Sequence, residues 1–122
     1  MKKAILIDVE KQEVIEILVG NGLDPIYNAI GNNCDTFCCP VSFANDDTLY
    51  SDDEILLRID DIKGGFALPN FRIPLLNNAI ILGTNEEGGS IDHSTSIEEI
   101  KESIVFFGEE FCKEYANDVM GT

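Results

Sequence analysis

Basic residues are scarce in this sequence. Eight Lys and Arg stand against 23 Asp and Glu, so the formal net charge at pH 7 is −15. Residues 13–56 contain nine acids and no base, and residues 74–99 contain five acids and no base. A surface of this charge repels phosphates and anionic lipids, so we expect no binding to duplex nucleic acid or to a membrane through ordinary electrostatics. The bases away from the two ends are Arg58, Lys63 and Arg72.

Long apolar runs are also missing. After the first three residues, the apolar run from Ala4 to Ile7 stops at Asp8, which is too short for the core of a signal peptide. No stretch approaches the roughly 20 apolar residues of a transmembrane helix. We therefore expect a cytoplasmic protein in which the cysteines stay reduced. These cysteines are Cys34, Cys38, Cys39 and Cys112.

Apolar residues, in contrast, make up 44% of the chain and recur in patterned blocks of Ile, Leu, Val and Phe. This composition argues against disorder despite the high net charge. A chain of 122 residues can also bury enough surface to fold without a metal or a disulfide. We therefore expect one domain spanning residues 1–122.

Signatures of catalysis and metal binding are missing as well. His93 is the one histidine, and we expect it to be exposed in a polar loop. The cysteines Cys34, Cys38 and Cys39 lack the paired C-x-x-C spacing of structural zinc sites. No phosphate loop or calcium loop occurs, because the required glycine spacing is missing. We expect no catalytic residue, metal or cofactor, while a carboxylate pair that hydrolyses glycosides stays open as an alternative.

The first third of the chain predicts a hairpin and a short helix. Residues 3–9 and 13–19 are rich in Ile, Leu and Val and are separated by a short polar segment, which is typical of two antiparallel strands. A helix is expected near residues 24–31, with Asp24 as its cap, Pro25 in its first turn and Gly31 as its stop signal.

The middle of the chain is less regular. Residues 34–44 predict one irregular edge strand or two short strands, because Pro40 cannot donate a ladder hydrogen bond. Residues 48–50 predict a short strand, and Ser51 with Glu54 has the residue types of a capping box before a helical turn. We expect an ordered loop over residues 64–74, a buried strand over 79–82 and a loop over 83–89.

The C-terminal segment carries the strongest helical pattern. Thr95 with Glu98, or Ser96 with Glu99, fits a capping box, and a helix over residues 97–118 is expected unless Gly108 divides it. The fold class is therefore α+β, with an antiparallel sheet against which the C-terminal helix packs. The apolar positions expected to be buried are Ile100, Ile104, Phe107 and Phe111.

Phe106 is out of phase with this helical pattern. In an unbroken helix it lies among charged side chains, where an exposed aromatic residue indicates a contact with a partner or with a second copy of the chain. Alternatively, a break at Gly108 turns Phe106 into the core. Self-association through the C-terminal helix is the hypothesis that follows from the first alternative.

The order of several segments is distinctive. These segments lie within residues 2–100. They are Lys3-Ala4-Ile5-Leu6-Ile7-Asp8, Val14-Ile15-Glu16-Ile17, Ile26-Tyr27, Ile30-Gly31, Cys34-Asp35, Leu49-Tyr50, Asp52-Asp53-Glu54 and the turn Leu82-Gly83-Thr84-Asn85-Glu86-Glu87-Gly88 after Ala79-Ile80-Ile81. This order resembles a family of small uncharacterised domains from phages, plasmids and their bacterial hosts, although Asn85 replaces the aspartate expected in the turn. The resemblance implies a mixed α+β domain of mobile-element origin. It implies no activity.

Two hypotheses about function follow, and neither is enzymatic. The first is an acidic phage or mobile-element protein that docks a basic surface of a host protein, as a counter-defence inhibitor would. Its expected partner-binding residues are Asp46, Asp47, Asp52, Asp53 and Phe106.

The alternative is a protein that sequesters a small nucleotide-like ligand. Phe71 would stack on the base, while Arg58 and Arg72 would meet the phosphates. In the competing structural interpretation, Phe71 belongs to the core and the two arginines pair with Asp60 and Asp61.

Overall fold

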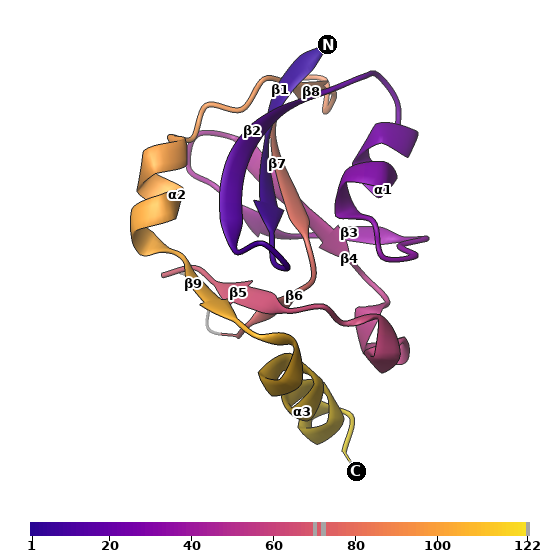
Figure 1. The fold of residues 1–122 in the computed structure, drawn as a ribbon. Coiled ribbons are helices and arrows are strands. Elements are labelled where there is room, and N and C mark those ends of the chain that lie inside the picture. Colours follow the sequence, from indigo (N-terminus) through magenta and orange to yellow (C-terminus); the bar gives the residue numbers. More distant parts are fainter. Residues whose placement is uncertain (70, 72, 122) are drawn as a thin grey trace.

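Among the residues that the computed structural model describes, 1–69, 71 and 73–121, two antiparallel sheets and three α-helices make up the fold (Figure 1). This mixture confirms the predicted α+β class. In the larger sheet the strands lie in the order β2 (Glu13–Val19), β1 (Lys2–Asp8), β7 (Ala79–Thr84), β4 (Asp47–Asp52) and β3 (Phe37–Ser42), and β8 (Ser90–Ile91) pairs with β7. The smaller sheet has the order β6 (Leu75–Leu76), β5 (Gly65–Ala67) and β9 (Val105–Phe107).

The N-terminal hairpin confirms the sequence prediction to within one residue. β1 and β2 pair without interruption from Lys2 opposite Val19 to Asp8 opposite Glu13. The carboxylate of Asp8 accepts hydrogen bonds from the N–H groups of Glu10 and Lys11, each 3.1 Å long. These bonds close the polar turn, because they give the turn's backbone donors an acceptor that the ladder does not supply.

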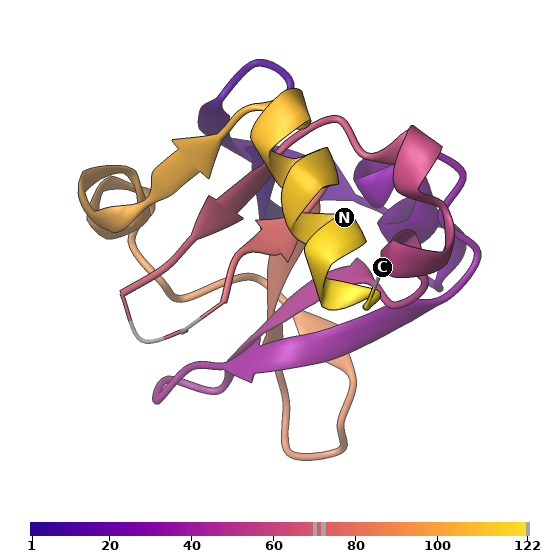
Figure 2. The same ribbon diagram turned by 90° about the horizontal axis from the view of Figure 1, so that it is seen from below.

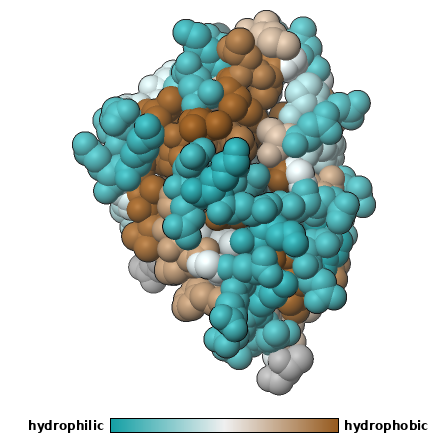
Figure 3. All heavy atoms as spheres, viewed as in Figure 1, coloured by the Kyte–Doolittle hydropathy of each residue, from teal (hydrophilic) through white to brown (hydrophobic). Residues whose placement is uncertain are grey.

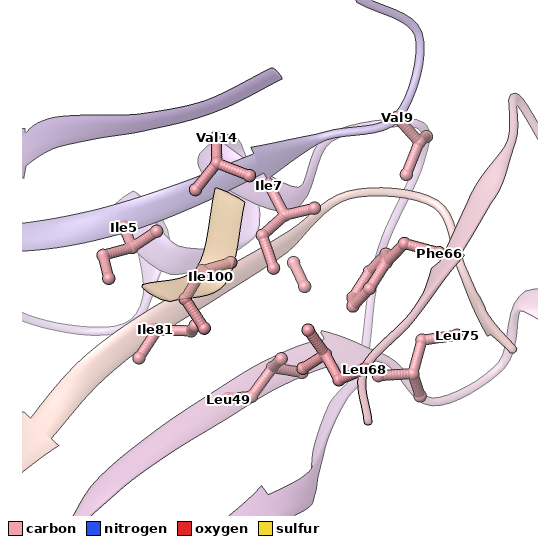
Figure 4. Packing of buried hydrophobic residues seen from close by; sticks show 11 residues of the cluster. Ile5, Ile7, Val9, Val14, Leu49, Phe66, Leu68, Leu75, Ile81 and Ile100 are labelled. Atoms are coloured by element: carbon pink, nitrogen blue, oxygen red, sulfur yellow. The ribbon is translucent and has the colours of Figure 1, made fainter. Parts of the chain in front are cut away.

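The central strands bury side chains on both faces of the larger sheet. On one face, Ile5 of β1 and Ile81 of β7 belong to a cluster with Phe66 of the smaller sheet and Ile100 of α2 (Ile97–Ser103) (Figure 4). The smaller sheet and α2 therefore cover this face together. The unbroken apolar run predicted to be a buried strand is confirmed in β7, since residues 79–83 are all buried.

α1 (Asp24–Ile30) covers the opposite face, where its buried Ile26 and Ile30 share a cluster with Ile80 and Leu82 of β7. Gly31 ends the helix at a φ of 67°, a conformation that favours glycine. The predicted cap is wrong, because the N-cap residue is Leu23 and no side chain caps the helix. Asp24 is the first helical residue instead, where its carboxylate interacts favourably with the helix dipole.

β3 is the irregular edge strand predicted around Pro40. Its pairing with β4 shifts register between Cys38 and Val41, which places Pro40 inside the irregularity. The strand predicted over residues 48–50 is confirmed within β4. The capping box at Ser51 and Glu54 does not form, because Ser51 still belongs to β4; the helical turns that follow are η1 (Ile55–Leu57) and η2 (Ile59–Asp61).

The loop prediction for residues 64–74 is wrong in part, because β5 pairs with β6 and β9. Glycine and proline lower strand propensity and therefore hid β5 in the sequence. Gly65 is required by close packing. A Cβ atom at this position would lie 2.6 Å from the carbonyl oxygen of Leu75 and 2.9 Å from Sγ of Cys112.

The helix predicted over residues 97–118 is divided into α2, β9 and α3 (Glu109–Val119). α2 ends at Ser103, five residues before Gly108, since the β-branched and aromatic residues Val105–Phe107 pair with β5 instead of continuing the helix. The second capping option is confirmed, because Oγ of Ser96 accepts a hydrogen bond of 3.4 Å from the N–H group of Glu99.

The division changes which C-terminal residues are buried. Ile100 is 5% exposed, whereas Ile104 and Phe107 are half-buried. Phe111 is 50% exposed and stacks on Phe107 with the ring centroids 4.9 Å apart, so its predicted place in the core is wrong.

We expect Ile100→Ala to lower the free energy of unfolding by about 2 kcal/mol and Phe111→Ala by less than about 1 kcal/mol. The difference follows from burial, since Ile100 belongs to the main cluster whereas half of Phe111 faces solvent. Urea unfolding of the two variants measures it. Equal losses would contradict this description of the C-terminal segment.

α3 completes the fold beside the smaller sheet and the two 3₁₀ turns (Figure 2). Its Cys112 and Ala116 are fully buried and contribute to a third cluster with Ile55, Ile62 and Leu76. In the described part of the chain, no helix combines the length and the apolar character needed to cross a membrane.

Candidate docking surface

The four aspartates predicted to bind a partner divide into two pairs. Asp46 and Asp53 are exposed, as expected. Asp47 is fully buried and Asp52 is 5% exposed, so the prediction that these two residues contact a partner is wrong. Their carboxylates hold the fold together from the two ends of β4.

Asp47 anchors the segment that joins β8 to α2. Its Oδ2 accepts hydrogen bonds from the N–H group of Ser94 (2.9 Å), the N–H group of Thr95 (2.7 Å) and Oγ1 of Thr95 (2.6 Å). Its Oδ1 lies 3.0 Å from the N–H group of Ser94. A buried carboxylate is tolerated here because backbone and hydroxyl donors replace the lost water.

Asp52 forms a cluster with Arg58 and Asp61. Nη2 of Arg58 lies 2.6 Å from Oδ2 of Asp52, and Nε lies 2.9 Å from Oδ2 of Asp61. Nη2 also donates to the carbonyl oxygen of Asn32 at 3.0 Å. The guanidinium lowers the pKa of the Asp61 carboxyl, chiefly through the hydrogen bond between Arg58 and Asp61. The hydrogen bond to Asp52 contributes most to the raised pKa of Arg58.

The ligand-binding alternative is therefore disfavoured at Arg58. Its donors already bind two carboxylates and a carbonyl, with which a phosphate would have to compete. Phe71 is half-buried against the main core cluster, as the structural interpretation expected, and it lines a groove of about 280 Å³ beside Leu68 and Ile100. Arg72 lies outside the described residues.

Phe106 does not lie on a charged helical face. It belongs to β9, opposite Phe66 of β5, and is half-buried against the main core cluster. The alternative in which this residue turns toward the core is the one that the geometry favours. The sequence argument for self-association through Phe106 assumed an exposed aromatic residue on a charged helix, and the structure does not support that assumption.

His93 is not an exposed loop residue. Its side chain is 10% exposed, Nδ1 lies 2.9 Å from the carbonyl oxygen of Thr95, and Nε2 lies 2.8 Å from Oε1 of Glu16. A carbonyl and a carboxylate both accept hydrogen bonds, so each ring nitrogen of His93 faces an acceptor. His93 thus joins β2 to the segment that Asp47 anchors.

The four cysteines are free thiols. Burial raises the pKa of Cys34 and of Cys112 to about 11, and it raises the pKa of Cys38 and Cys39 as well. All four therefore stay protonated and weakly nucleophilic at neutral pH. Within the described ranges, no group of three or more His, Cys, Asp or Glu side chains is arranged to hold a metal ion.

The two C-terminal helices expose a dense set of carboxylates. Lys113 pairs with Glu109 at 2.9 Å, and Lys101 lies 3.9 Å from Glu98. The remaining acids of α2 and α3 make no ion pair with another described residue and are exposed. We call these five residues the acidic helical set: Glu99, Glu102, Glu110, Glu114 and Asp118.

An apolar edge lies next to α2. In β2, the outermost strand of the larger sheet, Ile15 is 39% exposed and Leu18 is 62% exposed. Figure 3 shows hydrophobic side chains along β2 and again over β9. A groove of about 400 Å³ separates the beginning of β2 from the end of α2 and from β9, and its walls include Glu13, Ile15, Lys101, Ile104 and Phe106.

This edge was missed in the sequence, although a signal was present. The strand Glu13–Val19 carries apolar residues at five of its seven positions, whereas a half-buried strand alternates apolar with polar residues. The excess places apolar side chains where the fold has nothing to cover them. Sequence alone does not separate this pattern from that of a central strand, which is covered on both faces.

No family model, curated protein or solved structure matches this chain. The resemblance to small phage and plasmid domains therefore stays a hypothesis. In the turn on which it depends, Oδ1 of Asn85 accepts hydrogen bonds from the N–H groups of Glu87 (2.9 Å) and Gly89 (2.8 Å). The aspartate expected at this position has an oxygen that serves equally well.

Proposed function

We propose that this protein acts by docking a partner protein that has a basic surface, and that it performs no catalysis. The observation that carries the proposal is the exposed acidic helical set, which no basic residue of the described chain neutralises. Charge complementarity of this kind accelerates association with a partner of opposite sign and repels partners of the same sign.

The buried charged residues have structural roles, which leaves the exposed carboxylates as the charges that can meet a partner. Asp47, Asp52 and Arg58 bind one another or the backbone and hold the segments around the larger sheet together. The exposed charge is thus presented by a scaffold whose own charged groups have partners. The resemblance to mobile-element domains adds that the partner is a host protein, as in counter-defence.

Charge reversal on α2 and α3 tests the proposal. The protein is immobilised and exposed to an extract of bacterial cells at about 0.15 M and at about 1 M salt, where the screening length falls from about 8 Å to about 3 Å. We expect a retained protein that is lost at the higher salt and lost in the variant Glu102→Lys/Glu110→Lys/Glu114→Lys.

A second triple variant, Asp24→Lys/Asp35→Lys/Glu87→Lys, is the matched control, because it changes the net charge equally at exposed positions outside α2 and α3. It should retain the partner. Equal loss in both variants would show attraction by net charge alone. Retention of no protein by the unmodified chain would contradict the proposed function.

A further inference from the structure

β2 is an edge strand of the larger sheet, and its outer side faces no other strand among the described residues. Within the described residues, β2 pairs with β1 alone, and no backbone group of residues 13–19 makes a hydrogen bond to any other segment. The strand has seven residues, which corresponds to about 23 Å of extended chain. Its outward N–H and C=O groups can therefore pair with an added strand of similar length.

The opposite edge of the same sheet is protected, and the contrast is informative. β3 contains Pro40, which has no N–H group to donate, and its register shifts between Cys38 and Val41. β2 contains no proline, no glycine and no register shift. Proline and a register shift therefore protect the β3 edge and are absent from the β2 edge.

The side chains of β2 define the chemistry of the chain that would pair with it. Residues opposite Ala4 and Leu6 of β1 lie on the α1 side of the sheet, and these are Ile17 and Ile15. Glu16 lies on the other side, where it binds His93. A paired strand would therefore place alternate side chains beside the two isoleucines on one side, and beside Glu16 and Leu18 on the other.

We propose that β2 receives an extended segment of the partner protein, in which apolar side chains alternate with Lys or Arg, and that this segment extends the larger sheet by one strand. This inference rests on the proposed function and names the part of the partner that is recognised. The apolar residues cover Ile15 and Ile17, while the basic residues face Glu16 and the carboxylates of α2.

Charge decides between this occupant and a second copy of the chain. Two copies of β2 joined edge to edge would bring Glu13 and Glu16 of both molecules to one seam, and each molecule carries a net charge of −15. Like charges on adjacent strands are destabilising. A basic segment has the opposite effect, so it is the occupant that the edge favours.

Binding of a designed peptide tests the inference. The probe is Val-Lys-Val-Lys-Val-Lys-Val, which is as long as β2, added to the ¹⁵N-labelled full chain. We expect slowed amide hydrogen exchange at residues 13–19. We also expect chemical-shift changes at residues on both sides of the groove between β2 and α2. Two further probes carry N-methyl groups on alternate amides, one set for each edge of the peptide. Only one of these two should lose binding, by about tenfold or more, since one edge donates to β2.

Matched variants give the second readout. Leu18→Lys and Ile15→Lys place a positive charge on the exposed edge, and each should weaken peptide binding by about tenfold, which corresponds to about 1.4 kcal/mol. Leu57→Lys is the control, because Leu57 is 70% exposed in η1 and lies outside both sheets. It should bind the peptide as the unmodified chain does.

The outcomes separate this inference from the proposed function. Equal binding of both N-methylated peptides, or no binding of the unmodified peptide, would overturn strand pairing, whether or not the extract experiment retains a partner. A dimer in sedimentation that Leu18→Lys disrupts would overturn it in favour of a second copy. Failure of the proposed function is read independently, from the two triple variants.

Discussion

Replacing Asp47 by Ala is expected to lower the free energy of unfolding by about 3–5 kcal/mol, which is among the largest effects of a single substitution. The buried carboxylate accepts hydrogen bonds from the N–H groups of Ser94 and Thr95 and from the Thr95 hydroxyl. Truncation leaves the backbone donors without an acceptor and releases the segment before α2. Urea unfolding measures the loss.

Asp53→Ala is the control for this prediction, because Asp53 is an exposed carboxylate directly after the same strand. Its expected loss is less than about 0.5 kcal/mol. Asp47→Asn should lie between the two, at about 1–2 kcal/mol, since an amide oxygen replaces one acceptor without the charge. Faster amide exchange at Ser94 and Thr95 should accompany the loss. Similar losses for Asp47→Ala and Asp53→Ala would contradict the proposed role of Asp47.

Replacing Arg58 by Met is expected to have an effect of similar size, a loss of about 3–5 kcal/mol in the free energy of unfolding. The side chain of Asp52 is fully buried, so the substitution leaves a carboxylate in the interior without its positive partner. The double variant Arg58→Met/Asp52→Asn removes that unpaired charge. It should therefore be more stable than Arg58→Met alone, by at least about 1 kcal/mol.

The control is Lys113→Met, which removes an ion pair at the surface of α3. Its expected loss is below about 0.5 kcal/mol, because exposed pairs are screened by water and salt. If Lys113→Met and Arg58→Met destabilise the protein equally, the cluster around Asp52 does not have the role assigned to it.

The same cluster predicts a dependence of stability on pH. Arg58 holds the pKa of Asp61 below its ordinary value of 3.8, so the folded state favours the ionised carboxylate. This contribution is fully present above the unfolded pKa and is lost as the pH falls through the lower, folded pKa. Urea unfolding at a series of pH values should therefore show that the free energy of unfolding falls below about pH 4. In Arg58→Met, the free energy of unfolding should depend less steeply on pH in this range. An unchanged slope would contradict the coupling.

Local signals predicted the elements that depend on neighbours in sequence. The β1–β2 hairpin, α1 with Gly31 as its stop, the buried strand β7 and the Ser96 cap of α2 all follow from residue types within one turn or one strand. Where propensity and tertiary pairing compete, the prediction was wrong. The segment after Ser103 continues a helical pattern in sequence, yet it forms β9 because β5 offers a pairing edge.

The candidate site shows the same division. Asp46, Asp47, Asp52 and Asp53 are alike in sequence, since each is an aspartate in an acidic stretch. The fold buries two of them and exposes the other two, and it brings Arg58 to Asp52 and Asp61. The sequence predicted that Arg58 pairs with Asp61 but not that it pairs with Asp52. Asp52 precedes Arg58 by six residues and lies at the end of a strand, so sequence spacing does not indicate the contact.

The sequence by itself determined that this protein is strongly negative and has enough apolar residues to fold as α+β. It also determined strands and helices where periodicity and capping signals agree. Only the tertiary structure decided which charges hold the fold, which ones face water, and that β2 has an open edge while β3 is protected. The reason is that propensity and capping act between neighbours, whereas burial and strand order depend on residues far apart in the chain.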